Sequence, residues 1–127
     1  MGMYTELNFN SELKENTPQD IIDILKYMVG DLAQQPIVND TVGLFDDTRW
    51  AVMLQTDSYY FDADTHSTLR YDDISLTYYL CIQCNLKNYN SEIEEFIIWI
   101  KPYLNKQEGD FLGHYRYEEE KPTLIYM

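Results

Sequence analysis

The sequence predicts one α+β domain, residues 1–127, with a single antiparallel sheet of four or five strands and two helices on one face. Three observations lead to this prediction. A chain of 127 residues has the length of one domain with one core. With 45% hydrophobic residues, it has enough apolar side chain to fill that core. Four stretches alternate apolar and polar residues as half-buried strands do, and two others repeat apolar residues at helical spacing.

The first half of the chain is expected to contain a strand, a helix and a second strand. Residues 3–9 alternate apolar and polar side chains, which is the period of a half-buried strand. Residues 18–29 follow a hydroxyl residue and begin with proline, and their apolar residues recur at helical spacing. Residues 31–48 have no sustained period and are expected to connect this helix to the second strand, residues 49–56.

The second half is expected to contain two further strands, a helix and a short edge strand. A long alternation over residues 74–86 predicts the third strand, after a loop over residues 62–73. A capping box of serine and glutamate opens residues 91–104, whose apolar stripe predicts the second helix. Residues 111–118 alternate again and predict the fourth strand, and residues 122–126 are expected to return as an edge strand.

The order of these elements favours the ferredoxin-like arrangement, β-α-β-β-α-β with an optional last strand. Two helices are too few to cover both faces of such a sheet, so both are expected on one face and the other face is left open. The core between the helices and the sheet is expected to hold Leu7, Phe9, Ile21, Leu25, Trp50, Val52, Leu76, Tyr78, Leu80, Ile82, Phe96, Ile100 and Tyr115.

Charge and sequence pattern exclude several classes of protein. Nine basic residues against 22 acidic residues give a net charge of -13 and an isoelectric point near 4.2. This charge repels phosphate and anionic lipid, so direct binding to nucleic acid or to a membrane surface is not expected. No apolar run approaches the roughly 20 residues of a membrane span, and the first residues lack the pattern of a signal peptide. We expect a cytoplasmic protein, with Met3 as the natural start and Met1 and Gly2 added ahead of it.

Cys81 and Cys84 form a C-x-x-C motif, which occurs in redox pairs and in metal sites. They lie inside the third expected strand, and residues three apart in a strand point to opposite faces. Redox pairs instead stand at the start of a helix, and a zinc ion needs further ligands, for which His66 and His114 have no suitable spacing. We therefore expect one cysteine in the core, one on the sheet surface, and no cofactor or metal.

The loop before the third expected strand partly matches a calcium-binding loop. Asp62, Asp64 and His66 place possible metal ligands at alternate positions, and Asp73 takes the twelfth position. Calcium loops, however, have an oxygen ligand at the fifth position and glycine at the sixth, where this chain has His66 and Ser67. A solvated acidic loop is favoured, and opportunistic binding of a divalent metal is the alternative.

His114 and Arg116 are the one closely spaced pair of histidine and arginine, and in an enzyme they could act as general base and anion clamp. No recognisable motif connects a nucleophile or a carboxylate to them, and the sequence has no phosphate-binding loop, nucleophile elbow or metalloprotease motif. The sequence therefore favours a protein that is not an enzyme.

The last part of the chain resembles a known group of proteins. The resemblance rests on KNYNSEIEEF at 87–96, Trp99, Pro102 with Tyr103, FLGHYRYE at 111–118 and PTLIY at 122–126. This stretch, roughly the C-terminal third of the chain, resembles small uncharacterised proteins of bacteria and their phages. The resemblance implies kinship of fold, and it implies no activity and no catalytic residues.

The open face of the predicted sheet is the first candidate site. By the alternation of the strands it would carry Tyr4, Met53, Tyr79, Cys81, Leu112, His114 and Arg116. The chain has 12 tyrosines, more than its core needs, and tyrosine and arginine are enriched in protein interfaces. We expect a non-catalytic protein-interaction module that forms a homodimer through this face, and an ordinary solvated surface is the alternative. RNA recognition would need aromatic platforms in a basic field, which this charge does not supply.

The acidic residues give the second candidate site. Two loops could come together as one acidic patch, formed by Asp62, Asp64, Asp72, Asp73, Glu118, Glu119 and Glu120. Such a patch would present carboxylates to a basic groove as nucleic acid presents phosphates. The alternative function is therefore an acidic inhibitor, a nucleic-acid mimic or immunity-type protein of phage origin, that blocks a basic nucleic-acid-handling protein. Scattered acids that keep the surface solvated are the simpler interpretation.

Overall fold

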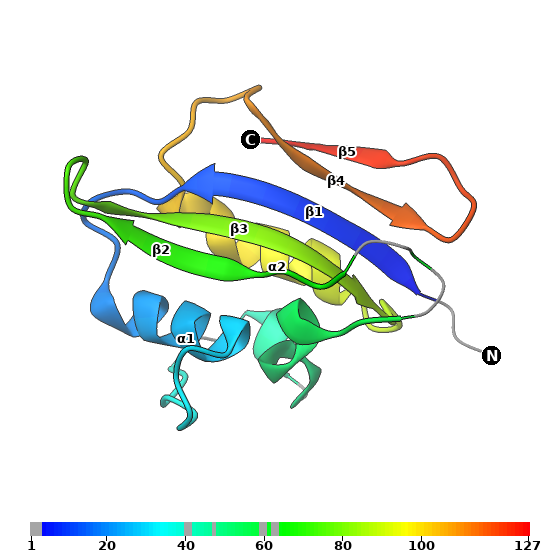
Figure 1. The fold of residues 1–127 in the computed structure, drawn as a ribbon, viewed down its shortest axis with the longest axis horizontal. Helices are drawn as coiled ribbons and strands as arrows, with labels where there is room; N and C mark the ends of the chain where they lie inside the picture. Colours follow the sequence, from blue (N-terminus) through cyan, green and yellow to red (C-terminus); the bar gives the residue numbers. More distant parts are fainter. Residues whose placement is uncertain (1–3, 40–41, 47, 59–60, 62–63) are drawn as a thin grey trace.

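The computed structural model describes residues 4–39, 42–46, 48–58, 61 and 64–127. Over these residues the sheet has five strands, β1 (Thr5–Glu12), β2 (Thr68–Asp72), β3 (Thr77–Leu86), β4 (Phe111–Tyr117) and β5 (Thr123–Tyr126). The α-helices of the same residues are α1 (Gln19–Val29) and α2 (Glu92–Ile100), and both lie on one side of the sheet (Figure 1). Short 3-10 turns are η1 (Gly43–Phe45), η2 (Thr48–Ala51), η3 (Met53–Gln55) and η4 (Lys101–Tyr103). None of the described helices is long and apolar enough to cross a membrane.

The strands of the sheet follow the order β2-β3-β1-β4-β5, and every neighbouring pair is antiparallel. β1 is central: it pairs with β3 on one side and with β4 on the other, so that Leu7 lies opposite both Cys84 and Tyr115. The first four strands have the order of the ferredoxin-like fold, and β5 is added beyond β4. The predicted fold class is therefore confirmed, including the edge strand at the end.

The prediction of the second strand over residues 49–56 is wrong. These residues form 3-10 turns, and β2 takes the corresponding place in the sheet from a stretch that was expected to be a loop. Trp50, Met53 and Leu54 are buried, whereas Val52, which was expected in the core, is 59% exposed. Buried residues three and four apart have helical spacing, so this segment buries its apolar side chains as a succession of turns.

β3 begins at Thr77, later than the predicted start at residue 74, because the chain turns first. The carboxylate of Asp72 accepts hydrogen bonds from the Ile74 N–H at 3.0 Å and from the Ser75 hydroxyl at 2.9 Å. These hydrogen bonds lower the pKa of Asp72, because they favour its charged form. Leu76 adopts a left-handed backbone conformation in this turn and is 57% exposed, so its predicted place in the core is wrong.

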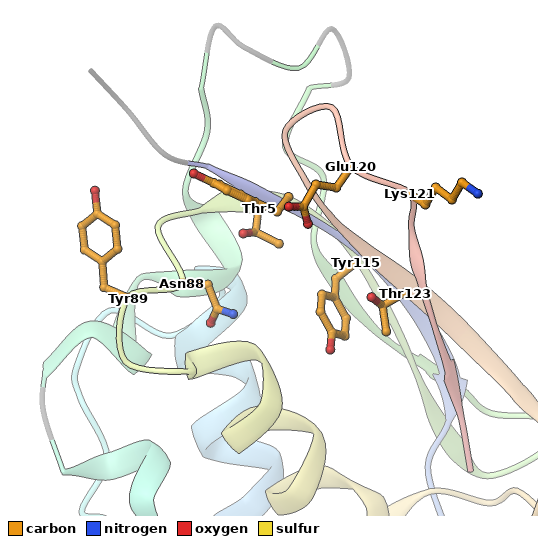
Figure 2. Close-up of a pocket in the computed structure, with 8 residues that line it drawn as sticks. Thr5, Asn88, Tyr89, Tyr115, Glu120, Lys121 and Thr123 are labelled. Carbon is orange, nitrogen blue, oxygen red and sulfur yellow. The ribbon is translucent and has the colours of Figure 1, made fainter.

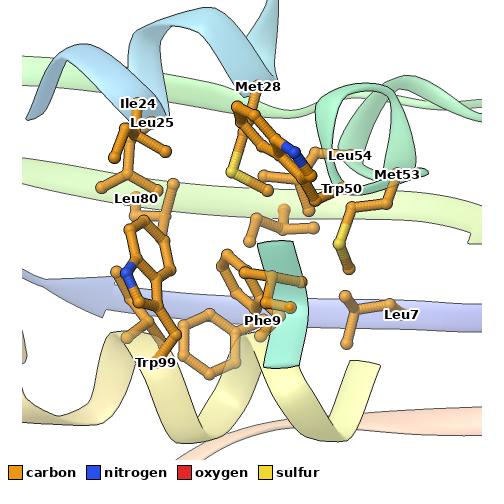
Figure 3. Packing of buried hydrophobic residues seen from close by; sticks show 14 of the residues in the cluster. Leu7, Phe9, Ile24, Leu25, Met28, Trp50, Met53, Leu54, Leu80 and Trp99 are labelled. Atoms are coloured by element: carbon orange, nitrogen blue, oxygen red, sulfur yellow. The ribbon is translucent and has the colours of Figure 1, made fainter. Parts of the chain in front are cut away.

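The core lies between the sheet and the helices (Figure 3). Phe9 of β1 and Phe96 of α2 meet edge to face, with ring centroids 5.9 Å apart. Phe45 packs between Trp50 and Trp99, with centroid distances of 5.0 Å and 5.4 Å. These edge-on contacts are the arrangement that aromatic quadrupoles favour. The predicted core residues that are buried are Leu7, Phe9, Ile21, Leu25, Trp50, Leu80, Ile82, Phe96 and Ile100, and Tyr78 and Tyr115 are partly buried.

The start of α2 differs from the predicted capping box. Ser91 has a left-handed backbone conformation, and its side chain makes no cap hydrogen bond. Instead, Asn88 Oδ1 accepts a hydrogen bond from the Ile93 N–H at 2.9 Å. Glu92 Oε2 accepts another from the Asn90 N–H at 3.0 Å, and Glu92 Oε1 lies 3.2 Å from an Arg49 guanidinium nitrogen. The loop before α2 is therefore held by side chains at the helix start.

Candidate functional site

The sheet face without helices, which we call the open face, carries alternate residues of each strand. Partners in register share a face, so the open face is assigned from the pairing of β1 with its two neighbours. Its residues on the central strands are mostly polar, in contrast to the alkyl and aromatic residues that face the helices. They are Glu6, Asn8, Asn10 and Glu12 of β1, and Tyr79, Cys81, Gln83 and Asn85 of β3.

A β-bulge in β4 changes which residues reach the open face. Phe111 is paired with Tyr126 and Gly113 with Ile125, so β4 has one extra residue in this stretch. Leu112 is therefore turned into the core, where it is 2% exposed, and its predicted place on the open face is wrong. Phe111 takes the place on the open face instead.

Gly113 is required at this bulge. A Cβ at this position would lie 1.9 Å from the Asn8 carbonyl oxygen, because β1 and β4 approach each other closely here. The φ angle of Gly113 is +153°, which side chains rarely adopt. Glycine next to two apolar residues was the one sequence signal that could have indicated the bulge.

Met53 and Tyr4 also lie away from the predicted site. Met53 belongs to η3 and is 2% exposed in the core on the helix side, so its predicted place on the open face is wrong. Tyr4 precedes β1, and its ring lies 5.6 Å from the Lys87 ammonium. It lines a small cavity together with Met53 and Leu86, apart from Tyr79.

His114 and Arg116 do lie on the open face, and they share a carboxylate there. Glu6 Oε1 is 3.6 Å from His114 Nε2 and 3.8 Å from Arg116 Nε, and the Glu6 side chain is only 14% exposed. An arginine that already faces a carboxylate attracts a further anion less strongly. The geometry therefore favours a structural role for this group over the anion clamp of an enzyme.

The segment before β2 covers this end of the open face. Phe61 is 6% exposed, and its ring centroid lies 5.2 Å from the guanidinium carbon of Arg116. Such a distance is typical of a cation–π contact. The Gln83 side chain of β3 donates a hydrogen bond to the Asp64 carbonyl oxygen at 2.9 Å, and this bond holds the same segment to the sheet.

The uncovered part of the open face has an apolar cluster that the sequence did not predict. Phe111, Leu124 and Tyr126 are 56%, 50% and 48% exposed on the neighbouring strands β4 and β5. The rings of Phe111 and Tyr126 meet edge to face at 5.8 Å. Tyr79 on β3 is 41% exposed on the same face. We call Phe111, Leu124 and Tyr126 the edge cluster.

Charge on the open face is nearly balanced, although the whole chain carries -13. Its strands present Arg70 and Arg116 against Glu6, Glu12 and Asp72. Most of the remaining acidic residues are in α1, α2 and the loops. The open face is therefore the part of the sheet where an approaching acidic protein meets the least repulsion.

The predicted acidic patch is divided between the two ends of the sheet (Figure 1). Asp72 and Asp73 lie at the turn from β2 to β3, and residues 118–120 lie at the turn from β4 to β5 at the opposite end. Asp64 lies beside β3, where its carbonyl oxygen accepts the Gln83 hydrogen bond. Asp62 lies outside the described residues. The described carboxylates therefore do not form the single stripe that was expected.

The cysteines point to opposite faces of β3, as predicted. Cys84 is fully buried on the helix side, and Cys81 is half-buried on the open face. Burial raises the pKa of the Cys84 thiol to about 12, so this thiol stays protonated and unreactive at neutral pH. In the part of the chain that the structure describes, no group of three or more histidine, cysteine or acidic residues could hold a metal ion.

Comparisons with protein-family models, with curated proteins and with solved structures found no match for this chain. The resemblance of the last third of the chain to bacterial and phage proteins therefore stays a prediction.

Proposed function

We propose that this protein is a non-catalytic protein-interaction module that forms a homodimer through its open face. The observation that carries the proposal is the edge cluster, in which three large apolar side chains stay about half exposed beside one another. Phenylalanine and tyrosine are among the residues enriched at protein interfaces, where they provide large contact areas at low entropy cost. An apolar cluster of this kind, rimmed by polar side chains, is typical of a binding surface.

The balance of charge favours a second copy of the chain as the partner. Two molecules that each carry -13 repel one another over most of their surfaces. On the open face, Arg70 and Arg116 offset most of the carboxylates, so this approach has the smallest electrostatic cost. A two-fold dimer would also bring each edge cluster against the same face of its partner.

The group around Glu6 supports a role other than catalysis, because His114 and Arg116 both face its carboxylate. The proposed compartment is the cytoplasm, where Cys81 and Cys84 would stay as the free thiols of the structure. Direct partners would be proteins, and the negative charge disfavours nucleic acid and membrane surfaces.

Light scattering coupled to size-exclusion chromatography tests the proposal at micromolar concentration. The wild-type protein should have twice the chain mass of 15.2 kDa. The double variant Leu124→Ser and Tyr126→Ser should have the mass of one chain. Ile98→Ser is the matched control, because Ile98 is 60% exposed on α2, on the helix side. This control should remain a dimer, and a wild-type mass of one chain would overturn the proposal.

A second candidate is the acidic inhibitor of a basic nucleic-acid-handling protein. Its support is the net charge and an acidic hollow of about 260 Å³ beside the start of α2, which Asp46, Glu92 and Glu95 line together. This group differs from the predicted acidic patch. The carboxylates would contact a basic groove of the partner in the way that phosphates do.

Binding of the tagged protein to a purified basic nuclease, with duplex DNA as competitor, tests the second candidate. Binding should weaken steeply as salt approaches about 1 M, where the Debye length is about 3 Å. Duplex DNA should compete, and the pair Asp46→Asn and Glu95→Gln should bind less tightly than the matched pair Asp72→Asn and Asp73→Asn. Salt-insensitive binding, or binding that DNA does not displace, would count against this candidate.

A further inference from the structure

A pocket of about 310 Å³ lies on the helix side of the sheet, beyond the start of α2 (Figure 2). Thr5 and Tyr115 line it from the sheet, and Asn88 and Tyr89 line it from the loop that precedes α2. The turn from β4 to β5 closes another side through Glu120. The pocket faces the helix side, so it is separate from the open face and from the dimer proposed there.

Tyrosine side chains form much of the wall of this pocket. Figure 2 shows Tyr89 and Tyr115 on opposite sides of it, with Asn88 between them. Tyr117 also lines the pocket. Tyr89 is already in a cation–π contact with Arg49, whose guanidinium carbon lies 5.3 Å from its ring centroid, so it attracts a further cation less strongly than Tyr115 and Tyr117 do. Aromatic rings attract cations through the negative potential of their faces, so several of them around one space favour a cation.

The charge at the pocket is also suited to a cation. Glu120 lines it from the β4–β5 turn, and Figure 2 shows its carboxylate near Thr5. The pKa of Tyr117 is raised, first by partial removal from water and then by the charges of Glu118 and Glu120. Both carboxylates therefore place negative charge close to Tyr117 in the pocket wall, and the chain as a whole is strongly acidic.

One basic residue, Lys121, belongs to the same lining. Figure 2 shows its side chain extended away from Tyr115 and Asn88, toward the far side of the β4–β5 turn. Its long flexible stem keeps the ammonium in water, which is the usual behaviour of lysine. Lys121 therefore does not fill the space between the tyrosines.

The size and the lining of the pocket indicate which kind of cation fits. The volume is many times that of a metal ion, and the walls offer tyrosine rings and neutral hydroxyl and amide groups besides a single carboxylate. Metal ions such as calcium need six to eight oxygen ligands. Organic cations with an apolar body instead use aromatic walls and one counter-charge.

We propose that this pocket binds an organic cation, an alkylammonium or guanidinium group on a short apolar stem. Tyr89, Tyr115 and Tyr117 contact its apolar body and its charge, and Glu120 provides the counter-charge. The cation has two possible sources with the same chemistry, a free small molecule or a basic side chain of a protein partner.

NMR titration of the ¹⁵N-labelled full chain tests the proposal with defined probes. Choline is the small-molecule probe, and 3,3-dimethylbutan-1-ol is its neutral counterpart of the same shape. A short peptide with one arginine is the side-chain probe, and the same peptide with citrulline is its neutral counterpart. At least one cationic probe should shift the amide signals of Thr5, Asn88 and Tyr89 and bind about tenfold more tightly than its neutral counterpart. The cation that binds more tightly identifies the source.

Matched variants separate the pocket from general attraction to an acidic protein. Glu120→Gln and Tyr89→Leu should each weaken binding about two- to fivefold, the range expected for one exposed cation–π contact or one counter-charge. Glu119→Gln removes the same charge from the same turn, and Tyr71→Leu removes an exposed tyrosine of β2. Both controls should bind within about twofold of wild type.

Three outcomes would overturn the proposal. They are equal affinity for charged and neutral probes, equal loss of affinity in Glu119→Gln and Glu120→Gln, and the absence of shifts at the pocket with both cationic probes. Tyr89 is 54% exposed in a loop, so Tyr89→Leu should fold as the wild type does. None of these outcomes depends on whether the open face forms a dimer.

Discussion

The two faces of the sheet use the same strands for different purposes. On the helix side of β1, Leu7 and Phe9 are fully buried, whereas on the open face their neighbours Asn8 and Asn10 remain accessible to water. Burial of an apolar side chain contributes about 1.5–3 kcal/mol, and an exposed amide contributes little. Stability should therefore depend on the helix side, which leaves the open face free to carry a binding surface.

At the edge of the sheet formed by β4 and β5, the alternation between buried and exposed residues is shifted by one residue. The bulge turns Leu112 into the core and presents Phe111 to solvent beside Tyr126. Regular alternation would have placed Leu112 on the open face, and the bulge places the aromatic ring of Phe111 there instead. The proposed interaction surface depends on this local irregularity as well as on the alternation of the strands.

The largest expected effect comes from the helix side. Phe9→Ala should lower the free energy of unfolding by about 3–5 kcal/mol, because the ring is fully buried against Phe96 and its loss leaves a cavity. Asn10→Ala, on the other face of the same strand, should change it by about 0.5 kcal/mol or less. Urea denaturation measures both values. An equal loss for Asn10→Ala would contradict the difference between the two faces.

The next effect tests the bulge that divides the faces. Gly113→Ala should destabilise the protein by about 2–3 kcal/mol, because its Cβ would meet the Asn8 carbonyl oxygen. Gly109→Ala is the matched control, since Gly109 also has a positive φ of +91° but has nothing within 4 Å of the added Cβ. The control should cost about 1 kcal/mol, from backbone strain alone. Equal losses in denaturant would show that the close approach of β1 and β4 is unimportant.

A smaller effect depends on pH and distinguishes the two cysteines. Burial raises the pKa of Cys84 from its ordinary value of 9.0 to about 12, so the unfolded chain loses this proton at lower pH than the folded chain. The stability contributed by the buried thiol is therefore complete below about pH 9 and is lost as pH rises toward 12. By pH 10 the loss should be about 1 kcal/mol.

Denaturation curves at pH 8 and pH 10 check this expectation. In the wild type, the free energy of unfolding should be lower at pH 10 than at pH 8. Cys84→Ala should make this decrease about 1 kcal/mol smaller, whereas Cys81→Ala should leave it unchanged. The tyrosines and lysines also ionise in this range, and the comparison of the two variants cancels their common contribution. An identical pH dependence in both variants would show that the Cys84 environment has no such effect.

The smallest effect on stability belongs to the edge cluster. Leu124→Ser should change the free energy of unfolding by about 0.5 kcal/mol or less, because Leu124 is already 50% exposed. Its neighbour Ile125 is 4% exposed on the helix side, so Ile125→Ser should cost several times more. Both are measured in denaturant at concentrations low enough to keep the protein monomeric. A similar cost at the two positions would argue against the assignment of faces in β5.

Sequence patterns predicted the central elements because these have one buried side. In β3, Leu80, Ile82 and Cys84 alternate with more polar residues, and all three are buried on the helix side. β2 was missed because it is a short edge strand of five residues. Leu69 and Tyr71 alternate with polar residues there, but only Leu69 is buried and Tyr71 is 54% exposed. Weakly patterned edge strands carry little sequence signal.

Two further errors arose where apolar residues stand side by side in the sequence. Residues 49–56 fit both a strand and a set of turns, since almost every residue in the middle of that stretch is apolar. Phe111 and Leu112 are both apolar as well, so their faces could not be assigned without the bulge. Pairing with neighbouring strands determines whether such a segment is a strand and which face each residue takes. The periodicity of one segment does not reveal this pairing.

The central position of β1 also determines when the sheet can begin to form during synthesis. Residues 5–12 are synthesised before both of their partner strands, because β3 and β4 lie in the second half of the chain. At synthesis rates of about 5–20 residues per second, Leu7 and Phe9 remain unpaired for several seconds. Sheets held by such distant pairings fold slowly, since the long loops must close before their contacts form. The newly made chain therefore exposes the apolar side chains Leu7 and Phe9 throughout this interval.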